Sequence, residues 1–289
     1  MVSFSPGGTA DILARNIAQE ITGKTGISVI VENKPGGGGS IATEYVARSA
    51  PDGLTMLLHS TGAAIAPHLH KNVSYDLLKD LTTVTPVAAG PFILLTSPEV
   101  PAKTVKDFLA YARQHPGELN FGTGGMGSTA HLTGEKLKLD GGVDIVHVPF
   151  KGGSPAMAAV AGNQVQFVFE PIASSRAMVE AKRIIPLAVT SETRSKIWPE
   201  LPSIAEAGVD GFDISIWYSL FLPAGTPENI KQYWNETVQS VLNEKRVNDW
   251  LLSQGMEPMP MSLADAKTYM ATEYRKWGDV IEKGNISVE

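Results

Sequence analysis

The stretch Pro6-Gly7-Gly8-Thr9-Ala10-Asp11 joins a short apolar run to a helical pattern of apolar residues. Three more stretches repeat this order of apolar run, glycine-rich turn and helix: residues 35–40, 122–128 and 152–155. Each turn leaves backbone N–H groups unpaired at the start of its helix, where the helix dipole adds about half a positive charge. Because glycine lets a ligand approach this backbone closely, several such turns in one fold predict a cradle for a small anion.

Composition and charge exclude several other classes of protein. The chain carries 30 acidic residues against 24 lysines and arginines, and it has no basic run with interleaved aromatic residues, which argues against a nucleic-acid partner. The acidic balance also means that backbone dipoles, rather than the overall field, would have to hold an anion. The absence of cysteine excludes disulfides and thiolate metal sites, and the histidine spacing suggests no metal site, so we expect neither metal nor cofactor.

Alternating strands and helices predict an α/β fold in two lobes, each a mainly parallel sheet flanked by helices. Residues 1–95 and 222–289 would form lobe one, and residues 96–221 lobe two. Crossing segments near residues 94–96 and 219–221 would join the lobes around a hinged cleft, with the glycine turns at its mouth. The expected strands are 28–32, 54–60, 119–121, 143–148, 165–169, 184–190 and 212–222. The expected helices are 41–50, 105–114, 129–139, 155–161 and two amphipathic helices near the end, the second capped by Ser262.

The turn Gly122-Thr123-Gly124-Gly125-Met126-Gly127 supports an alternative function, because G-x-G-x-x-G between a strand and a helix is typical of dinucleotide sites. Such sites end the next strand with an acidic residue. Here the strand is followed by Pro149-Phe150-Lys151 instead. A nucleotide-dependent enzyme that uses this turn is therefore the second candidate.

Several single residues allow two interpretations. His131, in the first turn of a helix that Ser128 opens, either donates a hydrogen bond to a ligand or only packs. Asp11 is expected to cap its own helix rather than to touch a ligand, and Ser154-Pro155 fits an N-cap followed by proline at the first helical position. Trp217 is more typical of a core residue than of a stacking platform.

Motifs along the whole chain resemble one family. They include Phe4–Arg15, Val31–Gly39, His147–Gly152 and Pro223–Pro227. Together they resemble the periplasmic substrate-binding proteins of tripartite tricarboxylate transporters, the Bug or TctC family. The resemblance implies a two-lobed, type II-like periplasmic binding protein. Such a protein is monomeric and no enzyme, and it delivers a small organic carboxylate to membrane transporter subunits. The abrupt start, Met1-Val2-Ser3-Phe4, is interpreted as a chain without its signal peptide.

The resemblance also assigns the binding residues. It implies that they hold a carboxylate of the ligand, partly through bridging waters. In lobe one it implies Ser5, Thr9, Ala10, Asp11, Ser60 and Thr61. In lobe two it implies Gly124, Ser128, Thr129, His131, Lys151, Gly152, Gly153 and Ser154. We add Glu170 and Trp217 to the expected ligand-binding residues. Dicarboxylates, tricarboxylates, amino acids and aromatic acids all fit such a clamp. Many members carry Asp where this chain has Glu170, and a longer carboxylate there would shrink the site or reject a second negative group. We therefore expect a ligand other than a plain dicarboxylate.

Overall fold

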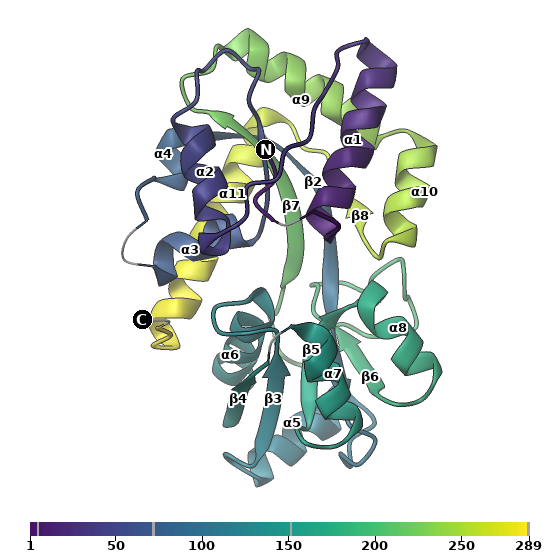
Figure 1. The fold of residues 1–289 in the computed structure, drawn as a ribbon. Coiled ribbons are helices and arrows are strands. Elements are labelled where there is room, and N and C mark those ends of the chain that lie inside the picture. Colours follow the sequence, from purple (N-terminus) through teal and green to yellow (C-terminus); the bar gives the residue numbers. More distant parts are fainter. Residues whose placement is uncertain (5, 71–72, 151, 288–289) are drawn as a thin grey trace.

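A computed structural model describes residues 1–4, 6–70, 73–150 and 152–287. The chain forms two lobes, drawn one above the other in Figure 1, with helices packed around the strands of each lobe. Both ends of the chain lie on the upper lobe, lobe one. No helix in the described ranges is long and apolar enough to cross a lipid bilayer.

Lobe one combines the beginning and the end of the chain. Its first elements are α1 Thr9–Thr25, η1 Gly37–Gly39, α2 Ser40–Ala47, β1 Leu57–Ser60, α3 Gly62–Leu69 and α4 Leu77–Asp80. Its last elements are β7 Ser215–Pro223, α9 Glu228–Leu242, α10 Lys245–Ser253, β8 Glu257–Pro258 and α11 Leu263–Lys283. Lobe two contains α5 Val105–Gln114, β3 Leu119–Thr123, α6 Thr129–Gly141, β4 Ile145–Pro149, α7 Gly153–Ala161, β5 Phe167–Pro171, α8 Ile172–Glu180 and β6 Ile185–Val189.

Strand β2, Leu81–Thr96, belongs to both lobes. Residues 81–91 pair antiparallel with β7, whereas residues 92–96 pair antiparallel with β5 and β6. The change of partner falls between Pro91 and Phe92, and Pro91 has no N–H to give to a ladder. The division of the chain at residues 95/96 and 221/222 stays a prediction. In the strand pairing, β7 lies along its whole length beside the lobe-one strands β1 and β2.

The expectation of a mainly parallel sheet in each lobe is wrong for lobe one. The pairs of β7 with β1 and β2, and of β2 with β8, are antiparallel. In lobe two, β3 pairs parallel with β4 and β5, but β2 pairs antiparallel with β5 and β6. The cause is the crossing itself, because β2 leaves lobe one and β7 returns to it, so two neighbouring strands run in opposite directions.

The bounds and caps of single helices were predicted from the sequence better than the pairing of the strands. Helix α5 has the expected bounds, and Ser262 caps α11 through its hydroxyl, which accepts from the N–H of Asp265. The expected strand at residues 28–32 is absent: Val29 and Val31 are half-buried there, but the only bridge nearby among the described residues joins the next residue, Asn33, to Val2. Helices α3, α4, α8 and α10 were not predicted. In α3, Pro67 lies inside the helix, and a proline at such a position is typical of a loop in the sequence.

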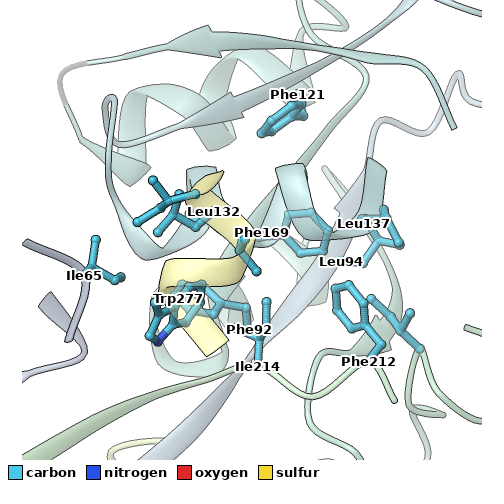
Figure 2. Packing of buried hydrophobic residues seen from close by; sticks show 14 of the residues in the cluster. Ile65, Phe92, Leu94, Phe121, Leu132, Leu137, Phe169, Phe212, Ile214 and Trp277 are labelled. Atoms are coloured by element: carbon cyan, nitrogen blue, oxygen red, sulfur yellow. The ribbon is translucent and has the colours of Figure 1, made fainter. Parts of the chain in front are cut away.

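One buried hydrophobic cluster runs through both lobes (Figure 2). This cluster contains Phe92 and Leu94 of β2 and Phe169 of β5. Trp277 of the last helix, α11, also belongs to it. Helix α11 packs on α3 and β2 in lobe one and also contacts α6 of lobe two. The C-terminal helix thus supports the region where the lobes join.

A buried carboxylate ties α11 to the crossing strand β7. Glu273 is 4% exposed, and it accepts hydrogen bonds from the indole N–H groups of Trp217 (2.8 Å) and Trp277 (3.2 Å). Lys276 completes the group as the ion-pair partner of Glu273. Since both indoles are fully buried, they depend on this acceptor.

Replacing Glu273 with Ala should destabilise the fold strongly. Each of the two buried donors left without a partner costs about 1–3 kcal/mol, so we expect the free energy of unfolding to fall by about 2–6 kcal/mol in chemical denaturation. Glu273→Gln keeps one acceptor oxygen and should lose less. The control is Glu282→Ala, an exposed position on the same helix, with a change within about 0.5 kcal/mol. Equal stabilities of Glu273→Ala and the unchanged chain would contradict this account.

Candidate functional site

A cleft of about 650 Å³ opens between the lobes. Lobe one contributes the first turn of α1 (Gly8, Thr9 and Ala10), Ser60 and apolar residues of α3. Lobe two contributes Glu170 of β5 and the turn before α6, including Gly124, Ser128 and Thr129. Phe92 of β2 and Ile216 and Tyr218 of β7 complete the lining at the crossing strands. Gly38 of the second glycine turn lines the cleft as well, so the first, second and third glycine turns meet at one cavity.

The first turn of α1 carries no side-chain cap. Gly8 is the N-cap residue, with extended backbone (φ −81°, ψ 169°), and its carbonyl accepts the bond from the N–H of Ile12. The N–H groups of Thr9, Ala10 and Asp11 lie ahead of this first intrahelical bond, at the positive end of a 17-residue helix. This end of α1 can hold a negatively charged group in the cleft.

Asp11 holds the first glycine turn through hydrogen bonds and lies outside the cleft lining. Its carboxylate accepts from the N–H of Gly7 (2.9 Å), the Nε–H of Arg15 (3.1 Å) and the side-chain amide of Asn33 (2.9 Å). The hydrogen bond from Arg15, with that from Gly7, lowers the pKa of Asp11 to about 2. The expected cap of α1 is wrong, because the carboxylate binds Gly7, ahead of the N-cap. Asp11 is buried and does not line the cleft.

Along β7, alternate side chains point to opposite faces. Ile216 and Tyr218 line the cleft, whereas Trp217 between them is fully buried and donates to Glu273. Tyr218 is hydrogen-bonded to Thr9, and its burial raises its pKa to about 12. Thr61 is buried as well: its hydroxyl accepts from the N–H of Trp217, and its own N–H donates to the carbonyl of Trp217. Trp217 and Thr61 thus hold β7 in place, away from the cleft lining.

The third glycine turn is held by a cap and by a histidine. The Ser128 hydroxyl accepts from the N–H of His131, as expected for an N-cap. The Nδ1 of His131 accepts from the N–H of Gly127 (3.1 Å), and its ring stacks on His147 at 3.9 Å between centroids. Burial lowers the pKa of both histidines to about 4. His131 therefore supports the turn and does not line the cleft, and a hydrogen bond from it to a ligand stays a prediction.

The loop before α7 lies behind Glu170. Helix α7 starts with Gly152 at the N-cap and no side-chain cap, so the expected cap by Ser154 is wrong. Gly152, Gly153 and Ser154 do not line the cleft. In lobe one, Gly39 is likewise the N-cap of α2, and Ser40 is the first residue of that helix. The expected site residues Ser5 and Lys151 lie outside the described residues.

The sequence missed the apolar wall of the cleft. Ile65, Ala66 and Leu69 come from α3, which was not predicted, and Phe92 and Ile216 from the crossing strands. The strict alternation of side chains along a strand would have placed Ile216 and Tyr218 on one face and Trp217 on the other. In the ranges that the structure describes, no group of three or more His, Asp or Glu side chains could hold a metal ion.

Known proteins identify this arrangement. Residues 13–286 match the tripartite tricarboxylate transporter family receptor, TctC. The chain belongs to this family. Protein BugT of Bordetella pertussis is 32% identical over 285 residues, which cover 98% of this chain and 87% of BugT.

Two solved structures extend the comparison. R. palustris Rpa4515 with adipate has a TM-score of 0.82 and 35% identity, covering 99% of this chain and 97% of that one. MatC from Rhodopseudomonas palustris with bound malate has a TM-score of 0.78 and 29% identity, covering 97% of each chain. The α/β periplasmic binding protein fold, with mixed sheets flanked by helices, is thereby confirmed. The chain is a TctC-family solute-binding receptor.

The stacked histidines predict a loss of stability in acid. Between their folded pKa of about 4 and the ordinary 6.5, the unfolded chain binds protons that the folded chain excludes. Their contribution is complete above about pH 6.5 and is lost as the pH falls towards 4, by at most about 1.4 kcal/mol per pH unit for each histidine.

We therefore expect His147→Gln to make the melting temperature fall less steeply from about pH 7 to about pH 5 than in the unchanged chain. The matched control is His115→Gln, which repeats the substitution away from the stacked pair. A steeper fall in His147→Gln would contradict the assignment.

Proposed function

We propose that this TctC-family receptor works outside the cytoplasm as a monomer without catalytic activity or cofactor. It captures a small organic carboxylate in the interlobe cleft and passes it to the membrane subunits of a tripartite tricarboxylate-type transporter. The observation that carries the proposal is the uncapped first turn of α1, whose residues Gly8, Thr9 and Ala10 line the cleft. The adipate and malate in the two solved relatives are small carboxylates of the same kind.

Backbone dipoles would hold the carboxylate. No lysine or arginine lines the cleft in the described part of the chain. Hydroxyl groups of Thr9, Ser60 and Tyr218 stand near the α1 turn as further donors. Hydrogen bonds from such groups to a charged acceptor are shorter and stronger than those between neutral groups.

Closure of the lobes would complete the site. The two covalent connections near Pro91 and Ile214 lie next to each other, since Pro91 of β2 is in register with Ser215 of β7. Rotation about this pair would move Glu170 and the turn before α6 towards the start of α1. This is the hinge type of domain closure around a ligand.

The nucleotide-dependent enzyme is the weaker candidate. At the Gly122–Gly127 turn, the N-terminus of α6 is already capped by the Ser128 hydroxyl, and the N–H of Gly127 is taken by His131. Strand β4 ends at Pro149 without the acidic residue that would bind a ribose.

A thermal-shift panel tests the ligand class. It contains linear, hydroxylated, amino and aromatic carboxylates together with NAD and NADP. We expect at least one carboxylate to raise the melting temperature, because a ligand at 100 times its Kd adds about 2.7 kcal/mol to the stability. The nucleotides should leave it unchanged. A shift with NAD or NADP and with no carboxylate would favour the enzyme.

Gly8→Val tests the backbone clamp. Valine tolerates the extended backbone at Gly8, so the chain should fold, but its branched side chain would cover the N–H groups of Thr9 and Ala10. Loss of two charge-assisted bonds, at about 1.5–3 kcal/mol each, predicts at least about a hundredfold weaker binding of the best carboxylate in calorimetry. The control is Gly23→Val, the same change at the exposed far end of α1. Unchanged affinity in Gly8→Val would rule out the clamp.

A further inference from the structure

Two helices present uncapped N-termini at the cleft region, one from each lobe. The start of α1 lines the cleft directly, with Gly8 as its N-cap. The start of α7, with Gly152 as its N-cap, also lacks a side-chain cap. A ligand with two carboxylates would suit two open sites of this kind.

In this chain the second site is not open, because Glu170 occupies its cleft side. The carboxylate packs against the backbone of Gly153, where an added Cβ would overlap both carboxylate oxygens. The backbone of the third glycine turn is close as well: a Cβ on Gly124 would lie 3.4 Å from the Gly153 nitrogen. Glycine at position 153 thus makes room for the chain's own anion beside α7.

Among the described residues, no lysine, arginine or histidine forms an ion pair with the Glu170 carboxylate. The side chain is buried, with Glu170 8% exposed, and the Ser174 hydroxyl donates to its Oε2 at 3.2 Å. Burial raises the pKa of Glu170 to about 7. A cation that entered the cleft would favour the charged form, and a second carboxylate would oppose it.

Much of the rest of the cleft lining is apolar. Phe92 and Ile216 from the crossing strands and Ile65 from α3 belong to it, beside His70, and such side chains suit a short hydrocarbon chain. The cleft therefore combines donors at α1 and apolar side chains with an acceptor at Glu170.

We propose that Glu170 sets the specificity of the cleft, which selects a ligand with one carboxylate at the α1 end and an ammonium group at the Glu170 end, and rejects α,ω-dicarboxylates. This inference rests on the proposed carboxylate-binding function. It assigns Glu170 as the residue that distinguishes an amino acid from a diacid of the same length.

Calorimetry with matched pairs tests it at about pH 8, where Glu170 is mainly ionised. The pairs are γ-aminobutyrate with succinate, 5-aminovalerate with glutarate, and 6-aminohexanoate with adipate. We expect one amino acid to bind at least about tenfold more tightly than its diacid. In Glu170→Gln this ratio should fall at least about tenfold, with the diacid gaining affinity, because the like charge has been removed. The control is Glu135→Gln, another buried carboxylate, which lies on α6 outside the cleft lining and should keep the ratio.

The outcomes separate this inference from the function on which it rests. A diacid that binds the unchanged chain as tightly as its amino acid, or an unaltered ratio in Glu170→Gln, overturns the specificity assignment and leaves carboxylate binding intact. Absence of binding by all six compounds overturns it too. The proposed carboxylate-binding function would be overturned only if, in addition, no carboxylate of the thermal-shift panel raised the melting temperature.

Discussion

The hydrogen bonding of β2 is the constraint on which the structure depends. A single 16-residue strand gives its first part to β7 and its last part to β5 and β6, so both sheets share one backbone. This continuity places Phe92 and Ile216 beside the cleft and brings the start of α1 opposite the start of α6. It also forces the antiparallel pairing of β2 with β7, which local sequence patterns do not reveal.

What could be predicted from the sequence was the part that short stretches of chain decide. Glycine turns, N-caps such as Ser128 and Ser262, and the bounds of α5 depend on neighbouring residues, and they were foreseen. The family resemblance, rather than any local pattern, placed Thr9, Ala10 and Glu170 at the cleft, whose lining contains all three. Contact of these residues with a ligand stays a prediction.

The rest depends on contacts between distant residues. The strand direction in lobe one, the apolar wall from α3 and the inward position of Trp217 follow from pairing and burial that no local pattern encodes. Asp11 shows the difference clearly. Its type and place suggested a helix cap, but Asn33, 22 residues away, helps to draw its carboxylate behind the turn. A residue can thus serve a binding loop without facing the ligand.

Pro91, at the boundary of the two sheets, affects the free energy needed to rotate one lobe against the other. Because Pro91 offers no amide hydrogen, it donates no ladder bond at the point where β2 changes partners. Opening and closing can therefore rotate the lobes while the bonds on either side of Pro91 stay intact. Amide exchange in β2 should then be slow and alike in the open and closed receptor, and the conformational entropy lost on capture should fall on a few torsion angles rather than on a disordered loop.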